Sequence, residues 1–232
     1  MKQVNTTGIV LTRVEYGEAD RIITFLTPDN GKVTCIAKSV RKAKSKLAGG
    51  IELFSISEIS YIVGKSDIST LTYTRLQKHY GNIVKELNRT QVAFEVIKLT
   101  NKSTEDTPEE EYYNLLDETF AALDDLKIDP QLTRTWFNMQ LLRIAGHTPD
   151  MRTDINGEKL EAHNSYDFHL DQMRFAQPIE REGSYDSNQI KFLRLCINAE
   201  RPNLLKRINN VDKLTDSTKV LVQSILSNYV RI

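Results

Sequence analysis

Between residues 6 and 76 the apolar and polar side chains alternate with the two-residue period of β-strands. Five segments rich in β-branched and aromatic residues are separated by short turn sequences. These segments are residues 7–14, 20–26, 32–38, 51–63 and 68–75. Short strands with tight connections predict a small closed barrel, and we expect the five-stranded OB-fold, a barrel that commonly binds oligonucleotides.

After residue 80 the period changes to that of an α-helix. Residues 107–110 have the threonine, proline and glutamate of a capping box, and Asp129 with Pro130 begins a later helix that Gly146 ends. The expected buried stripes are Ile83, Leu87, Phe94 and Ile97, then Tyr113, Leu116, Phe120 and Leu123, then Leu132, Trp136, Met139 and Leu142.

Residues 147–186 interrupt the helical pattern, and helices are expected again at 187–198, 201–208 and 215–229. The chain is therefore predicted to be α+β. An OB-fold domain occupies residues 1–80, and a helical domain with a polar, irregular insert occupies residues 81–232.

A segment of one charge sign stands out in a chain whose 31 basic residues equal its 31 acidic ones. Residues 31–50 hold six basic side chains and no acidic one: Lys32, Lys38, Arg41, Lys42, Lys44 and Lys46. Closely spaced cations repel one another, so this arrangement favours a repeating anion such as a sugar-phosphate backbone. The alternative is a solvated surface loop.

The two halves of the chain differ in charge. Residues 1–85 carry 13 basic and 7 acidic side chains, and residues 86–232 carry 18 and 24. We therefore expect the halves to meet different partners.

Strand alternation places Lys32 and Lys38 on the face opposite Cys35, and Arg13 and Arg21 on neighbouring strands could extend the basic patch. Tyr61, Tyr73 and Phe54 could stack on bases, or they could fill the core of a small barrel.

The sequence gives little support for a membrane protein, a secreted protein, a metal site or an enzyme. No apolar run is long enough for a membrane span, the first ten residues lack the layout of a signal peptide, and two cysteines in unrelated contexts fit a reducing cytosol. His147, His163 and His169 are dispersed among polar residues, where solvated histidines are the alternative to a metal site. No catalytic motif appears. We predict a cytoplasmic, non-enzymatic protein with no cofactor and no metal.

The first sixty residues resemble the bacterial RecO family of recombination mediators. The likeness rests on GIVL, YGEAD, TPDNGK, AKSVRKAKSKLAGG and IELF, and TRTWFNMQLLRIAGHTPD extends it into the helical half. The resemblance implies a nucleoid-associated protein that binds single- and double-stranded DNA and anneals complementary strands. It also implies pairing with RecR, and recognition of the acidic tail of single-stranded DNA-binding protein so that RecA is loaded.

The resemblance also suggests residue roles. It implies phosphate contacts at Lys32, Lys38, Arg41, Lys42, Lys44 and Lys46. For the acidic tail, we expect a cation beside an apolar groove, and the candidates are Arg134, Trp136, Phe137, Leu141 and Arg143. A plain core helix with exposed arginines is the alternative there.

One departure concerns metal. Many family members carry a four-cysteine zinc ribbon, whereas residues 151–175 contain no cysteine, so zinc is not predicted.

Two alternative functions remain open from the sequence. One is an RNA-binding OB module with a helical docking domain, and the other is a purely structural adaptor.

Overall fold

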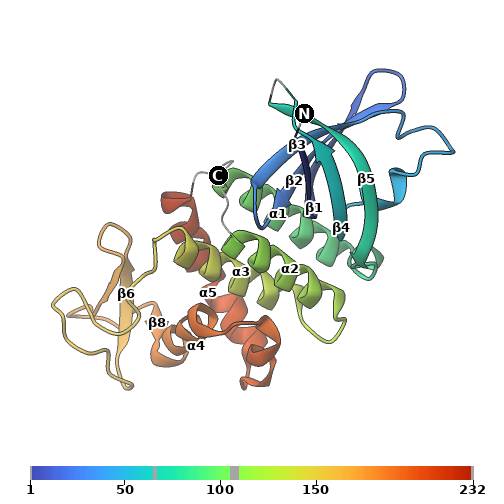
Figure 1. The fold of residues 1–232 in the computed structure, drawn as a ribbon. Helices are drawn as coiled ribbons and strands as arrows, with labels where there is room; N and C mark the ends of the chain where they lie inside the picture. The colour runs from blue at the N-terminus through green and yellow to red at the C-terminus, as the bar shows by residue number, and fades with distance from the viewer. Residues whose placement is uncertain (1, 65–66, 105–109, 231–232) are drawn as a thin grey trace. The chain divides into compact units, whose positions relative to one another are not determined.

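The computed structural model describes residues 2–64, 67–104 and 110–230. Contacts divide the chain into two compact units, Met1–Asp124 and Asp125–Ile232, referred to below as the N-terminal and C-terminal units. The predicted boundary at residues 80 and 81 marks the change from strands to helices (Figure 1). The division by contacts comes later because two helices pack on the barrel.

The N-terminal unit begins with a closed five-stranded barrel in the order β1-β2-β3-β5-β4. Only the β3–β5 pairing is parallel among the ladders of this barrel. The strands are β1 (Gln3–Tyr16), β2 (Asp20–Thr27), β3 (Gly31–Ala37), β4 (Ser55–Ile62) and β5 (Ile68–His79). Gly17 and Gly31 take positive φ values of 56° and 61° at the connecting turns, a region that glycine reaches without steric cost. The predicted barrel with a following helical part is confirmed.

The barrel core is filled by the inward side chains of each strand, including Ile23, Phe25, Cys35 and Ile59. Tyr61 belongs to this core and Phe54 is also buried, so both aromatic residues fill the interior rather than offering surface to bases. Burial raises the pKa of the Cys35 thiol to about 12.

The segment that follows β3 closes one end of the barrel. Val40 and Ile51 are buried in the core, and Leu47 packs against it just before a short 3₁₀ helix, η1 (Ala48–Gly50). A Cβ atom on Gly50 would lie 2.3 Å from Cβ of Thr74, so only glycine fits at this close approach.

Two helices, α1 (Leu87–Ser103) and α2 (Glu110–Asp124), complete the N-terminal unit after a 3₁₀ helix, η2 (Ile83–Lys85). The ring of Phe54 makes edge contacts with Phe94 at 5.2 Å and Phe120 at 5.6 Å between centroids. The predicted α1 stripe is partly wrong, because Leu87 is 72% exposed and Phe94 50% exposed. The predicted capping box at residues 107–110 lies mostly outside the described residues, which resume at Glu110.

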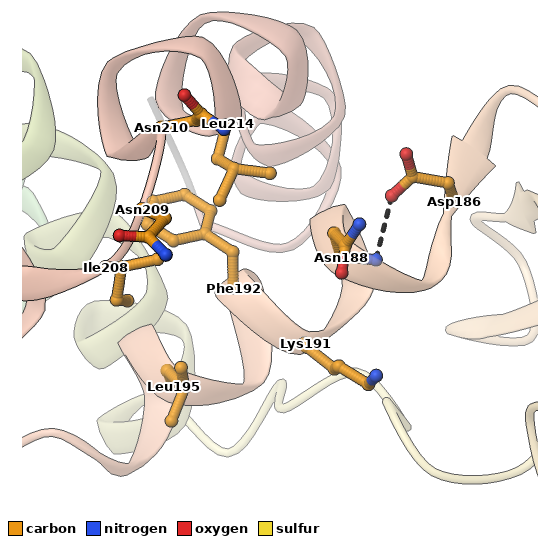
Figure 2. Close-up of a pocket in the computed structure, with 9 residues that line it drawn as sticks. All are labelled: Asp186, Asn188, Lys191, Phe192, Leu195, Ile208, Asn209, Asn210 and Leu214. Atoms are coloured by element: carbon orange, nitrogen blue, oxygen red, sulfur yellow. Dashed lines mark hydrogen bonds between the residues drawn. The ribbon is translucent and has the colours of Figure 1, made fainter. Parts of the chain in front are cut away.

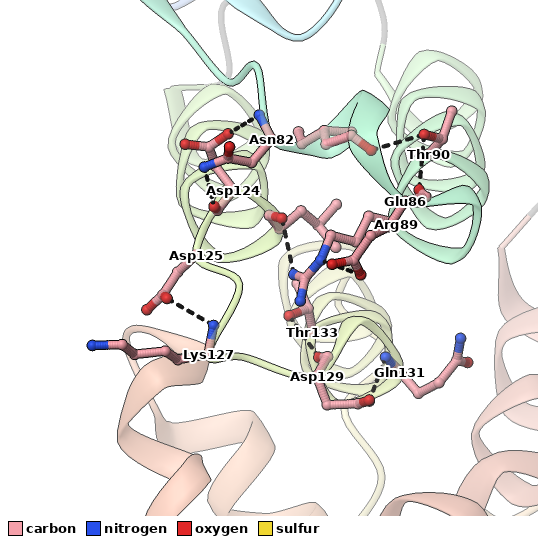
Figure 3. Close-up of polar contacts among 12 residues, drawn as sticks. Asn82, Glu86, Arg89, Thr90, Asp124, Asp125, Lys127, Asp129, Gln131 and Thr133 are labelled. Atoms are coloured by element: carbon pink, nitrogen blue, oxygen red, sulfur yellow. Dashed lines mark hydrogen bonds and ion pairs between the residues drawn. The ribbon is translucent and has the colours of Figure 1, made fainter.

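Polar contacts join the start of α1 to the end of α2 (Figure 3). The buried guanidinium of Arg89 donates to the Leu123 carbonyl and to the Glu86 carboxylate, each at 3.0 Å. The main-chain N–H of Asn82 donates to Asp124 Oδ1 at 2.7 Å. These contacts explain why the N-terminal unit extends to residue 124.

The C-terminal unit is built on α3 (Pro130–Ile144), α4 (Ser187–Asn198), a 3₁₀ helix η3 (Pro202–Arg207) and α5 (Val211–Tyr229). Asp129 caps α3 as predicted, accepting from the N–H group of Gln131 at 2.7 Å (Figure 3). It also accepts from the N–H group of Leu132 at 3.0 Å. Gly146 follows α3 with a φ of 77°.

The insert at 147–186 carries a small sheet in the order β7-β6-β8. Its strands are β6 (Ser165–His169), β7 (Arg174–Ala176) and β8 (Tyr185–Asp186), packed around the buried ring of Phe175. Along the described residues, no helix has the length and apolar character that crossing a bilayer requires.

Candidate nucleic-acid interface

The predicted basic segment, residues 31–50, comprises β3, a loop of residues 38–46 that we call the basic loop, and η1. Val40 anchors it in the barrel core, and main-chain turns at Ser39 to Lys42 and Lys42 to Ser45 shape it. Ser39 has a φ of 54°, and its N–H donates to Asp20 Oδ1 at 2.6 Å. The N–H of Arg41 donates to the Ala19 carbonyl at 2.9 Å. The basic loop is therefore fixed to the β1–β2 hairpin, and both project from the same end of the barrel (Figure 1).

Four lysines of the basic loop are exposed: Lys38, Lys42, Lys44 and Lys46. None of them makes an ion pair with another residue among those the structure describes. Their mutual repulsion is therefore not offset within the described part of the chain, and a polyanion binding here would relieve it.

The predicted arginines lie beside the basic loop but have carboxylate partners. Glu15 bridges Arg21 and Arg41, with N–O distances of 3.7 and 3.5 Å. Arg13 lies 3.1 Å from Glu52 and also donates to the Ile51 carbonyl. Because Glu15 and Glu52 are more than half exposed, these pairs are weak, and a phosphate could compete for the arginines.

Lys32 is not part of this cluster. It sits at the opposite end of β3 from Lys38, about 20 Å away at the usual strand rise. Its ammonium donates to the carbonyl of Asn101 in the last turn of α1, at 3.1 Å. A cation at a helix C-terminus stabilises the unpaired carbonyls there, so the structure supports a local structural role for Lys32.

The outer face of β1, β2 and β3 lies next to the basic loop. Ladder pairing aligns Val14 with Ile22 and Ile22 with Ile36, and Tyr16 with Asp20. Tyr16 is 54% exposed and Val14 is 59% exposed. Tyr16 was not among the aromatic residues predicted from sequence to stack on bases. The alternation of β1 could have indicated its exposure, because Tyr16 shares a face with Thr12 and Val14.

The third of those candidates, Tyr73, is 46% exposed and lies in β5. It lines a polar hollow that also contains Asp29 and Glu58. The carboxylates make this surface unfavourable for a phosphate chain.

The partner-binding residues predicted on α3 are mostly in the core. Trp136, Phe137 and Leu141 are at most 2% exposed, and Trp136 Nε1 donates to the Ala199 carbonyl at 2.8 Å. This corrects the prediction of an apolar groove there, because helix α3 packs against α4 and α5. Arg143 is exposed and its Nε donates to Gln140 Oε1 at 3.0 Å, and Arg134 is partly buried.

A pocket of about 400 Å³ lies elsewhere in the C-terminal unit, between α4 and the start of α5 (Figure 2). Phe192, Leu195, Ile208 and Leu214 form its apolar lining, and Lys191 and three asparagines lie at its edge. Asp186 also lines the pocket, so its charged lining is one cation and one carboxylate, although the neighbouring residues 188–213 carry six basic and two acidic side chains.

The described residues contain no group of three histidine, cysteine or acidic side chains placed to hold a metal ion. His163 lies 3.1 Å from Glu161, and His147 packs on the ring of Tyr229. Cys35 and Cys196 are buried in different units, so the residues present do not fit a cysteine zinc ribbon.

Comparison with known proteins covers nearly the whole chain. A family model described as the N-terminal part of recombination protein O matches residues 1–80, and its C-terminal counterpart matches residues 85–231. A protein named DNA repair protein RecO from Dehalococcoides mccartyi is 37% identical over 163 residues. This alignment covers 69% of the chain and 64% of the relative, so it spans less than two thirds of that protein's length.

A DNA repair protein RecO from Listeria monocytogenes serotype 4b is 28% identical over 239 residues. That alignment covers 96% of the chain and 86% of the relative. The similarity therefore includes both the barrel and the helical part.

Proposed function

The chain belongs to the recombination protein O family, and from this membership we propose that it is a recombination mediator in DNA repair. In this proposal it binds single- and double-stranded DNA and anneals complementary strands at the nucleoid. The single observation that carries the DNA-binding part is the basic loop, whose four lysines are exposed without carboxylate partners in the described structure.

Annealing by this protein would need no covalent step. Lysines of the basic loop would neutralise phosphates on two strands and release their condensed counterions. The repulsion between the strands would fall, and the local concentration of complementary bases would rise. Arg13, Arg21 and Arg41 would join when phosphate displaces Glu52 and Glu15.

The C-terminal unit is proposed to meet protein partners. With RecR, the protein would help RecA to load onto DNA coated by single-stranded DNA-binding protein. The acidic tail of that protein requires an apolar groove beside cations. Because the predicted groove on α3 is buried, we place the tail in the pocket of Lys191, Phe192 and Leu195 (Figure 2).

A salt titration tests the DNA-binding part. Replacing Lys38, Lys42, Lys44 and Lys46 with alanine should weaken binding to an oligothymidylate strand. Each lost contact should reduce the slope of log affinity against log salt by about 0.7. The matched control removes four exposed lysines elsewhere, Lys98, Lys102, Lys213 and Lys219. Equal slopes for the two variants would show that the basic loop is only solvated surface.

Annealing of complementary strands coated by single-strand binder, with and without RecR, tests the mediator role. The wild-type protein should accelerate annealing, and the basic-loop variant should not. Competition between matched RNA and DNA strands separates this function from an RNA-binding module, which would favour RNA. A structural adaptor would bind neither.

A further inference from the structure

The outer face of β1, β2 and β3 has a composition that the barrel core does not explain. Its cross-strand rows are threonines, Thr12, Thr24 and Thr34, followed by aliphatic residues, Val14, Ile22 and Ile36. Tyr16 comes next along β1, paired with Asp20. Val14 and Tyr16 are more than half exposed, so this face offers apolar and aromatic surface to the solvent.

This face borders the basic loop directly. Asp20, the ladder partner of Tyr16, accepts the N–H of Ser39, the second residue of the basic loop. Strand alternation places Lys38, directly after β3, in the same cross-strand row as Tyr16 and Asp20. The aromatic ring and this lysine therefore belong to one connected surface.

Acidic residues of the hairpin do not cancel the charge of this surface. Glu15 is shared by two arginines, and Asp20 is engaged by a main-chain N–H. Counting the basic loop, the hairpin and the neighbouring Arg13 and Glu52 pair, seven basic side chains face four acidic ones, Glu15, Glu18, Asp20 and Glu52. The net charge stays positive where an anionic strand would arrive.

We propose that a single strand of nucleic acid crosses the outer face of β1, β2 and β3, with an unpaired base stacked on Tyr16. The phosphates lie on the basic loop, and Val14 contacts the sugar or the neighbouring base. This inference rests on the proposed DNA binding and names the residue that distinguishes an unpaired strand from a duplex. Stacking requires an open base face, and bases in a duplex already stack on each other.

The comparison with Tyr73 supports the choice of Tyr16. Both tyrosines are about half exposed on the barrel, at 54% and 46%. Tyr73 shares its hollow with two carboxylates, whereas Tyr16 adjoins the basic loop. Of these two tyrosines, Tyr16 is the one beside the exposed lysines of the basic loop, so Tyr73 provides a matched control.

The test compares Tyr16→Ala with Tyr73→Ala and with the conservative variant Tyr16→Phe. Tyr16→Ala should weaken binding of an oligothymidylate strand by roughly 5- to 150-fold, the loss expected for one stacked base. Tyr16→Phe and Tyr73→Ala should stay within about twofold of wild type, because stacking needs the ring and not its hydroxyl. Melting curves confirm folding, which is expected because both side chains are exposed.

Two further ligands isolate the stacking contribution. An abasic strand keeps the phosphates without the bases, so its affinity should be the same for wild type and Tyr16→Ala. Duplex DNA should also bind wild type and Tyr16→Ala with equal affinity, because its bases already stack on each other. In addition, Tyr16→Trp should show quenched fluorescence with oligothymidylate, whereas Tyr73→Trp should not, above the constant emission of the buried Trp136.

Different results would contradict the stacking of a base on Tyr16 and the proposed DNA binding. If Tyr16→Ala binds oligothymidylate like wild type while the basic-loop variant does not, the stacking inference fails and the proposed DNA binding stands. An equal loss for the thymidylate strand, abasic strand and duplex would also overturn stacking. If neither variant changes any affinity, the proposed function itself fails.

Discussion

The main-chain N–H of Ser39 donates a 2.6 Å hydrogen bond to the carboxylate of Asp20. This contact fixes the start of the basic loop to the β1–β2 hairpin and supports Ser39 in its left-handed conformation. It therefore sets where the lysines lie relative to Tyr16.

Replacing Asp20 with alanine should loosen the basic loop. A hydrogen bond to a charged group contributes about 1.5–3 kcal/mol, and its loss should lower the free energy of unfolding by an amount in that range. Denaturant titration measures the change, and amide hydrogen exchange should speed up in residues 38–46. Asp216→Ala, an exposed site on α5, should alter neither, and unchanged exchange in Asp20→Ala would show that other contacts hold the loop.

Replacing Glu15 with glutamine should strengthen DNA binding. The change removes the carboxylate that holds Arg21 and Arg41, so both guanidinium groups become available to phosphates. Two added contacts would steepen the salt slope for a single strand by about 1.4. Fluorescence anisotropy at several salt concentrations measures this, with Asp216→Asn as the control for lost charge alone. Weaker binding by Glu15→Gln would mean that Glu15 positions the arginines usefully.

Changes in the pocket of Figure 2 should weaken capture of an acidic peptide without affecting DNA binding. Lys191→Glu reverses a charge at the edge, and Leu195→Asp places a carboxylate in the apolar lining. We expect about a tenfold loss for either, which corresponds to about 1.4 kcal/mol and is typical of a contact near the centre of an interface. Fluorescence polarisation with a peptide ending in the tail sequence measures it.

Two controls locate the peptide site. Val220→Asp alters an exposed apolar residue of α5 and should leave peptide affinity unchanged. Arg134→Glu should also leave it unchanged. Loss of affinity in Arg134→Glu, but not in Lys191→Glu, would return the site to the arginines of α3.

Replacing Arg89 with methionine should destabilise the N-terminal unit. The Arg89 side chain is 4% exposed, and its guanidinium donates to the Glu86 carboxylate and the Leu123 carbonyl (Figure 3). Losing the hydrogen bonds that this charged group donates should cost about 1.5–3 kcal/mol, because Glu86 is half exposed and does not remain as a buried charge. Chemical denaturation followed by circular dichroism checks this, and Lys98→Met at an exposed site of the same helix should cost little. A small effect in Arg89→Met would show that apolar packing compensates for the lost bonds.

Acid should weaken the small sheet of the insert. Hydrogen bonds from the Ser184 side chain and main chain, with Arg181 beside them, lower the pKa of Asp167 below its usual value despite an opposing effect of burial. Because the folded pKa is depressed, the ionised carboxylate stabilises the fold above its unfolded pKa near 3.8, and this contribution is lost as the pH falls through the folded value.

Asp167→Asn should therefore melt earlier than wild type at pH 7, and the difference should shrink in the window below about pH 4. Thermal melts at several pH values, with hydrogen exchange over residues 147–186, measure it. A difference that stays constant down to pH 2 would show that the charge of Asp167 does not stabilise the sheet.

Local sequence patterns were sufficient to predict the barrel strands, the capped start of α3 and the composition of the basic loop. These features are local: alternation along β3 decides that Cys35 and Ala37 face inward, and Asp129 caps a helix through N–H groups two and three residues away. The absence of carboxylates from residues 31–50 is visible without any fold.

The availability of each cation for a ligand depends on contacts between segments that are distant in the sequence. The pairing of Arg41 with Glu15 depends on the β1–β2 hairpin meeting the basic loop, and Lys32 bonds to Asn101, 69 residues away. Likewise, the exposure of Tyr16 and the burial of Trp136 depend on which surfaces other elements cover. The spacing of apolar side chains along the sequence shows which residues share a face of a helix or strand. Packing between distant segments determines whether that face contacts protein or solvent.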